Sequence, residues 1–267
     1  MITLQHSLIT LFANNGNEEE LSKEIAYILL PDAIRKYTGL RQYSHFEINP
    51  SNGDTSWIKY PTNLKELNDE TVEKLPKYLA TKLTKCVLGE KTEINVFQKY
   101  NKHLPKDEYF GIKKHLIQDQ IFDKWIREEI DCSRRNENVF LFQCKEFQGT
   151  DIRKLITDIE YQGLYILAYM NYQTYGITTN QEWFNKYVKE QLDLAYPKDL
   201  VDRTYQYMRI PDYINEKISK HDWSELKQGY VSLESYIDMY KSVASEMIKI
   251  DMQKQNESKN DELEKDK

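Results

Sequence analysis

Aliphatic residues recur at helical spacing in most long windows of this 267-residue chain, which is the pattern of helices with one apolar face. Glycine (9 residues) and proline (7 residues) are scarce, so few positions interrupt that pattern. Helices are predicted over about residues 3–13, 18–30, 64–89, 91–101, 108–131, 150–175, 180–195, 199–207, 211–219 and 232–253. The sequence therefore predicts an all-α fold.

The breaks between these helices predict how the chain is organised. Asn14–Asn17 ends the first helix, and Pro31 is expected to end or bend the second. Turn-forming residues in His45–Asn63 predict an ordered loop. Because no solenoid repeat and no Ser/Gly-rich linker divides the chain, residues 1–252 are expected to form a single multi-helix domain. Residues 253–267 are charged and polar, which predicts a disordered, flexible tail.

Composition narrows the functional classes only slightly. No apolar run approaches the roughly 20 residues of a membrane span, and the N-terminus lacks the features of a secretory signal, so we expect no transmembrane segment and a cytoplasmic location. Cys86, Cys132 and Cys144 are too irregularly spaced for a disulfide framework or a cysteine zinc site. The formal charge of −6 disfavours broad electrostatic capture of nucleic acid, but it leaves nucleic acid open as a substrate.

Candidate chemistry is densest in the predicted helix that contains Gly111–Trp125. His115, Asp119 and Asp123 recur there every fourth residue, which places them within roughly 80° of one another on one helical face. The same arc carries, or borders on, Ile112, Leu116, Phe122, Ile126 and Ile130. Carboxylates in an apolar stripe need compensation, either from a divalent cation or from an internal salt bridge to lysine or arginine.

Three further ligand-type residues precede this helix. His6 lies in the first predicted helix, Asp32 directly follows Pro31, and His45 follows Ser44. The order of these pieces, followed by Gly-x3-His-x3-Asp-x3-Asp, resembles the zinc-dependent phospholipase C family and its wider relatives. The resemblance covers roughly residues 1 to 130 and implies an all-α fold that encloses a metal cluster.

The resemblance implies specific metal ligands, namely His6, Asp32, His45, His115 and Asp119. Asp123 stands where the family usually has histidine, and we include it as a sixth candidate ligand. Zinc is the metal that the family implies. A carboxylate in place of an imidazole makes the site harder, which keeps manganese, iron and magnesium open as alternatives.

If the metal cluster forms, nearby residues are expected to have further roles. Asp119 would bridge or orient two metal ions, and Glu47 would orient a ligand or act as a general base. Arg35 and Arg41 lie between Asp32 and His45 and are left open between holding a phosphate group and solvation at the surface. Glu160 is left open between a late ligand and a helix-surface acid, whereas His103 and His221 are expected to be exposed or to cap helices.

These residues predict a metal-dependent phosphoesterase, in which a metal-activated water hydrolyses a phosphodiester or phosphomonoester of a small phosphorylated substrate. The chain lacks a Gly-x-Ser-x-Gly elbow, a phosphate-binding Gly-rich loop and a dinucleotide fingerprint. A phosphohydrolase of the HD type, which also binds metals through His and Asp on helices, is a second enzymatic interpretation. The alternative from another class is a degenerate member of this fold that acts as a binding or interaction protein.

Overall fold

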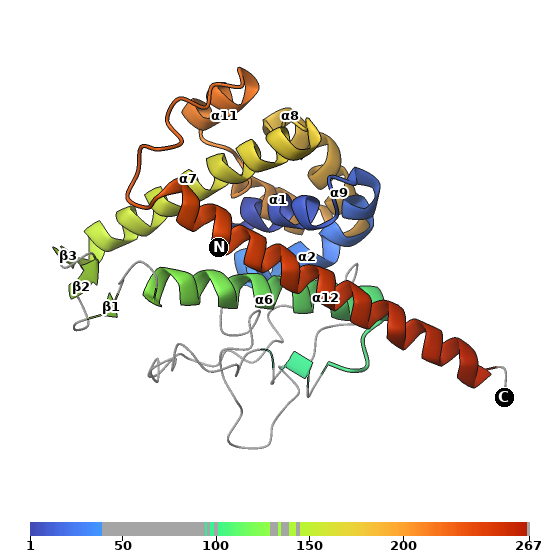
Figure 1. The fold of residues 1–267 in the computed structure, drawn as a ribbon. Coiled ribbons are helices and arrows are strands. Elements are labelled where there is room, and N and C mark those ends of the chain that lie inside the picture. The colour runs from blue at the N-terminus through green and yellow to red at the C-terminus, as the bar shows by residue number, and fades with distance from the viewer. Residues whose placement is uncertain are drawn as a thin grey trace.

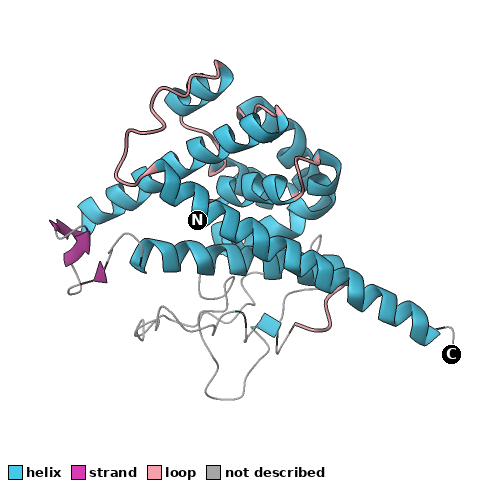
Figure 2. Cartoon of the chain, viewed as in Figure 1, coloured by secondary structure: helices cyan, strands magenta, loops and turns pink. Residues whose placement is uncertain are grey.

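The computed structural model describes residues 1–38, 94, 97–98, 101–128, 133–134, 139–142 and 145–265. Within these residues the molecule is built mainly from helices, as predicted, with one small sheet that was not predicted (Figures 1 and 2). None of the helices in this part of the chain is both long and apolar enough to cross a membrane. The finer expectation, a zinc-dependent phospholipase C fold, stays a prediction.

The helix predicted over 64–89, the loop predicted over His45–Asn63 and most of the helix predicted over 91–101 lie outside the described residues. Within the described residues the helices follow the predicted order. They are α1 (Thr3–Ala13), α2 (Glu18–Thr38), α6 (Lys106–Glu128), α7 (Gly149–Tyr175), α8 (Gln181–Phe184), the π-helical segment η3 (Asn185–Lys189), α9 (Glu190–Ala195), α10 (Lys198–Gln206), α11 (Asp212–Ser219) and α12 (Leu233–Lys265). The strands are β1 (Ser133–Arg134), β2 (Val139–Phe142) and β3 (Lys145–Gln148). They form an antiparallel sheet in sequence order, and the sheet lies where α6 ends and α7 begins (Figure 1).

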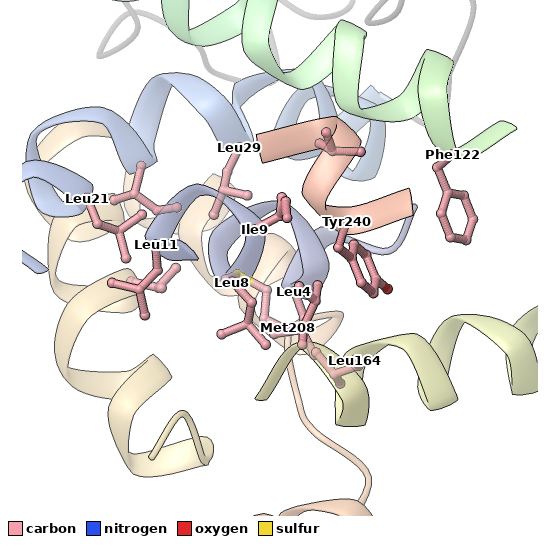
Figure 3. Packing of buried hydrophobic residues seen from close by; sticks show 14 of the residues in the cluster. Leu4, Leu8, Ile9, Leu11, Leu21, Leu29, Phe122, Leu164, Met208 and Tyr240 are labelled. Carbon is pink, nitrogen blue, oxygen red and sulfur yellow. The ribbon is translucent and has the colours of Figure 1, made fainter. Parts of the chain in front are cut away.

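Helix α1 lies at the centre of the fold, packed against α2, α7 and α12. Every residue from Thr3 to Leu11 is buried, and Leu4, Leu8 and Leu11 contribute to the main hydrophobic core (Figure 3). Each fully buried leucine contributes about 1.5–3 kcal/mol to stability. A helix that is surrounded on all sides buries polar residues as well, so His6 is placed inside the molecule.

Helix α2 continues through Pro31 to Thr38, so it does not end at the proline, which was one of the two predicted outcomes; the other, a bend, stays a prediction. A proline inside a helix costs about 3 kcal/mol. The neighbouring Leu29 and Leu30 are both fully buried, and the burial of two such side chains is worth about as much or more. Tertiary packing therefore overrides the local preference, and it keeps Asp32 on a helix.

The last helix also differs from the prediction. Helix α12 runs to Lys265, so residues 253–265 are helical where the sequence predicted a flexible tail. Contacts with the start of α6 account for the difference. Lys254 Nζ lies 2.7 Å from Asp107 Oδ1, and Lys106 Nζ lies 2.5 Å from Asp261 Oδ2. These ion pairs give the polar end of α12 partners that local sequence patterns do not reveal.

Candidate metal centre

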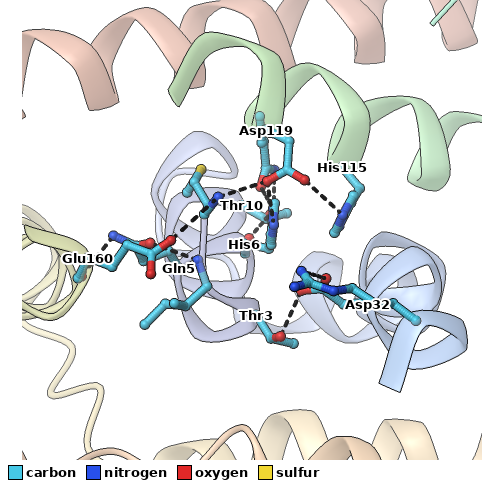
Figure 4. Close-up of polar contacts among 12 residues, drawn as sticks. Thr3, Gln5, His6, Thr10, Asp32, His115, Asp119 and Glu160 are labelled. Atoms are coloured by element: carbon cyan, nitrogen blue, oxygen red, sulfur yellow. Dashed lines mark hydrogen bonds and ion pairs between the residues drawn. The ribbon is translucent and has the colours of Figure 1, made fainter. Parts of the chain in front are cut away.

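Three buried ligand-type side chains from three helices meet beside the core. They are His6 of α1, Asp32 of α2 and His115 of α6, and one ligand atom from each lies within 4.8 Å of the other two. Their exposed fractions are 0%, 3% and 0%. Figure 4 shows the two imidazoles and the carboxylate turned toward one another. The structure thus brings together three of the residues that the sequence singled out.

Close packing of α6 on α2 positions two of these residues. A Cβ atom added at Gly111 would lie only 2.4 Å from Tyr27 Cβ, so only glycine permits this approach of the two helices. His115 lies one turn after Gly111 on α6, and Asp32 follows Tyr27 by a little more than one turn on α2. The close contact therefore carries His115 and Asp32 toward the same point.

Asp119 lies against both histidines. Its Oδ1 atom is 3.3 Å from His6 Nε2, and its Oδ2 atom is 3.6 Å from His115 Nε2. The two imidazole rings are stacked, with centroids 3.9 Å apart and planes inclined by 23°. The α-amino group of Met1 lies 2.9 Å from Asp119 Oδ1. Asp119 is thus buried between the Met1 ammonium and the two imidazoles.

A second layer of carboxylates surrounds the Met1 amino group. Glu160 Oε1 of α7 lies 3.9 Å from this nitrogen. Burial raises the pKa of the Glu160 carboxyl; the Met1 ammonium opposes the rise, and the charges of Asp119, Asp123 and Asp32 add to it. Burial alone would lower the pKa of the Met1 amino group, but Asp119, Glu160 and Asp123 together hold it above its ordinary value. The sequence left Glu160 open, and the structure places it beside the candidate centre.

Two residues that the sequence did not single out hold the ligands in place. Thr3 Oγ1 donates a hydrogen bond of 2.7 Å to Asp32 Oδ2. Gln118 Oε1 lies 2.6 Å from His6 Nδ1. Helical spacing offers a weak signal for both, because each lies three residues along its helix from a ligand-type histidine, on the same side. Such supporting hydrogen bonds are typical of built metal sites.

The remaining predicted site residues fall into three groups. His45, Glu47 and Arg41 lie outside the described residues. Asp123 is half-buried one turn beyond Asp119, and its part as a ligand stays a prediction. Arg35 Nη1 lies 4.0 Å from Asp32 Oδ1, and its side chain is 38% exposed, so it stands between the buried group and solvent.

The His-Asp dipeptide of this chain, His221–Asp222, does not join the candidate centre. Both residues are exposed, His221 has a φ of 52°, and its Nε2 atom lies 2.6 Å from Thr178 Oγ1. His103 is also exposed. Both histidines lie in polar turns, as expected, and the position of the dipeptide argues against an arrangement of the HD type within the described residues.

The donor set fits a divalent transition metal. Two imidazoles and one carboxylate match the three protein ligands of many zinc sites, which leave a fourth position open. Donor atoms around a tetrahedral zinc lie about 3.4 Å apart, so side-chain movements of about 1 Å would close the group. His6 Nε2 is buried and has no hydrogen-bond partner among the described residues. Without a proton or a metal ion between them, the lone pair of His6 Nε2 would face the Asp119 carboxylate, which is unfavourable in a buried site.

Comparisons with family models, with curated proteins and with solved structures give no match for this chain. The chemistry of the site must therefore be argued from its own geometry. Fold alone would not establish an activity in any case, because one fold can carry many functions.

Proposed function

We propose that this chain binds a divalent transition metal through His6, Asp32 and His115, with zinc as the first candidate. The observation that carries the proposal is the convergence of these three buried side chains, with ligand atoms within 4.8 Å of one another. Thr3 donates a hydrogen bond to Asp32, and the Met1 ammonium lies beside Asp119; a cation bound at this point would stabilise both buried carboxylates further. Two imidazole nitrogens and carboxylate oxygens suit zinc better than calcium or magnesium.

The reaction that we assign to this centre is hydrolysis of a phosphodiester or phosphomonoester. When bound, such a metal supplies an activated water at neutral pH and polarises the phosphoryl group. Asp119, whose oxygens lie 3.3 Å from His6 Nε2 and 3.6 Å from His115 Nε2, would supply a carboxylate oxygen beside the metal. Arg35, partly exposed beside Asp32, would bind the phosphate of a small substrate through its planar guanidinium. The order of the ligand-type residues within 1–130, which resembles that of the zinc-dependent phospholipase C family, supports this reaction class.

Metal binding is tested first. The purified protein is stripped with chelator, and zinc, manganese and magnesium are titrated into the parent and into Asp32→Asn, which keeps the size of the side chain. We expect tight zinc binding by the parent, a rise in melting temperature on loading, and a loss of affinity of about 100-fold or more in the variant, since even outer partners of a metal contribute 10–100-fold. His221→Asn is the matched control, because asparagine tolerates the positive φ at that exposed position.

The reaction is tested with a panel of phosphodiesters and phosphomonoesters at matched metal loading, with and without chelator. Chelator-sensitive hydrolysis that Asp32→Asn loses and His221→Asn keeps would support the proposal. A parent protein that retains no metal would refute both parts. Tight metal binding without hydrolysis of any ester would instead favour a binding or interaction role for this fold.

A further inference from the structure

Gln118 is a fully enclosed polar residue in contact with His6, one of the candidate metal ligands. It lies on α6 between His115 and Asp119, and its side chain is fully buried. Its Oε1 atom is 2.6 Å from His6 Nδ1, while its Nε2 atom is 3.1 Å from Thr10 Oγ1 and 3.4 Å from Met247 Sδ. The amide thus joins three helices, α1, α6 and α12, at the back of the His6 ring.

The neighbours of this amide determine which way it faces. The hydroxyl of Thr10 has one proton, which it donates to the backbone oxygen of His6 at 2.7 Å. Thr10 Oγ1 must therefore accept a hydrogen bond from the third group that it contacts, and the thioether of Met247 can only accept. Both contacts require the NH2 group of Gln118, so the amide oxygen of Gln118 faces His6.

The orientation of the amide in turn fixes the proton on His6. An amide oxygen carries no hydrogen, so the short contact of 2.6 Å requires a proton on His6 Nδ1. In the neutral ring, the lone pair then lies on Nε2. This is the atom that lies 3.3 Å from Asp119 Oδ1 and faces the candidate centre.

We infer that Gln118 is a positioning residue that selects the Nδ1–H tautomer of His6 and so presents Nε2 as the metal-binding atom. This inference rests on the proposed function, because it assigns the means by which one ligand of that centre is prepared. Thr10 and Met247 belong to the same hydrogen-bond network, because their contacts with the NH2 group keep the amide of Gln118 from exchanging the positions of its oxygen and nitrogen. The chain of hydrogen bonds thus runs from α12 through α6 to the ligand on α1.

The first test removes the acceptor while keeping the volume. In Gln118→Met we expect the affinity for zinc to fall 10- to 100-fold, the range typical of losing the partner of a metal-bound histidine. Gln118→Glu keeps an acceptor opposite His6 Nδ1 but loses the NH2 contacts with Thr10 and Met247, so its affinity should lie between those of Gln118→Met and the parent. Equal affinity in the parent and Gln118→Met would overturn the inference, and so would Gln118→Glu and Gln118→Met losing the same amount.

A second pair of variants guards against a folding defect in Gln118→Met. Thr10→Val removes the hydroxyl that orients the amide and should lower zinc affinity several-fold. Thr204→Val is the matched control, because Thr204 is fully buried on α10 and makes the same bond to the carbonyl four residues before it. Equal zinc affinity in these two variants would also contradict the inference.

The tautomer itself is read by NMR of protein labelled with 15N in its histidine rings. Metal-free parent protein is studied up to pH 9, where an ordinary imidazole is neutral. A proton on His6 Nδ1 in the parent that is lost or shared with Nε2 in Gln118→Met supports the inference, and an Nδ1 without a proton in the parent overturns it. Because this measurement needs no metal, it separates the two hypotheses: a correct tautomer in a protein that binds no zinc would refute the proposed function and, with it, the metal-directed role of Gln118.

Discussion

Two parts of α6 balance their buried charges in different ways: the residues up to Lys114, called the first half below, and those from His115 onward, called the second half. In the first half, the side chain of Lys114 is 2% exposed, and its Nζ atom lies 2.8 Å from Glu24 Oε2 and 2.6 Å from Asp251 Oδ1. In the second half, His115 and Asp119 lie beside His6. All three side chains can donate an electron pair to a metal ion. The charge of Lys114 in the first half is compensated by carboxylates of the neighbouring helices, whereas the second half brings potential metal-ligand atoms together.

The difference distinguishes a structural charge cluster from a candidate binding site. Buried ion pairs are retained when every charge meets an opposite one, and α2 and α12 supply both carboxylates that Lys114 needs. Imidazoles and carboxylates that converge lower their energy when a cation or protons join them. The second half of α6 therefore depends on its solution conditions more than the first.

The largest expected effect comes from breaking the compensated half. Lys114→Met keeps most of the side-chain volume but leaves the carboxylates of Glu24 and Asp251 facing each other. We expect the free energy of unfolding to fall by about 3 kcal/mol, measured by urea denaturation of the metal-free protein. The triple variant that adds Glu24→Gln and Asp251→Asn should recover most of this loss. A drop below about 1 kcal/mol would show that the first half is not held by its charges.

The second prediction concerns the ligand-rich half. Asp119→Asn preserves size and removes one charge, so the fold should persist while metal affinity and phosphoesterase turnover fall about 100-fold, which corresponds to about 2.7 kcal/mol. Calorimetric zinc titration and hydrolysis at matched metal loading measure the two effects. If Asp119→Asn kept the affinity and turnover of the parent, Asp119 would be no more than a structural partner of the Met1 amino group.

The third prediction links the two halves at Gly111. A methyl group there would meet Tyr27 Cβ at 2.4 Å, so Gly111→Ala should push α6 from α2 and lower stability by about 2 kcal/mol. Zinc affinity should fall as well, since His115 and Asp32 would separate. Gly176→Ala serves as a control: its φ of 73° penalises alanine, but no atom crowds the added methyl. That variant should lose stability and keep its zinc affinity.

The smallest effect is expected from Glu108, a buried carboxyl in the first half of α6. Its Oε1 atom has no hydrogen-bond partner in the described part of the chain, and burial raises its pKa from 4.5 to about 7. The folded protein therefore binds this proton more tightly than the unfolded chain, so stability is full below pH 4.5 and is lost as the pH rises through 7.

Replacing this carboxyl should remove that pH dependence. Between pH 4.5 and 8, the parent should lose on the order of 1 kcal/mol more than Glu108→Gln, as measured by melting curves at a series of pH values without metal. Identical pH profiles would mean that Glu108 is solvated in the folded protein. Every charged group in the first half of α6 would then be stabilised, either by an opposite charge or by water.

The helices were largely predictable because the spacing of apolar residues within each helix is a local property of the sequence. The window 150–175 matches α7 (Gly149–Tyr175) to within one residue at its start. The sequence allowed α2 to end at Pro31 and predicted a flexible tail where α12 continues. Both differ from the structure because contacts with residues distant in the sequence decide them. No local pattern carries the ion pair of Lys106 with Asp261.

The candidate site was predictable only in part, for the same reason. His6, Asp32 and His115 could be proposed from residue type and order, since few side chains bind metals. Gln118 could not, because its role depends on how α6 crosses α1 and on the hydroxyl of Thr10. Glu160 was ambiguous until the packing of α7 placed it 3.9 Å from the Met1 amino group.

The burial of α1 has a consequence for how the chain folds. Its partners are remote in sequence: Gln5 bonds to Tyr240, 235 positions later, and His6 contacts Gln118, 112 positions later. Contacts of such long range slow folding, because a large loop must close before they form. During synthesis, the apolar α1 emerges long before α12 exists to cover it. The nascent chain should therefore expose this helix until α12 has been synthesised, and it should need a chaperone to reach the native state efficiently.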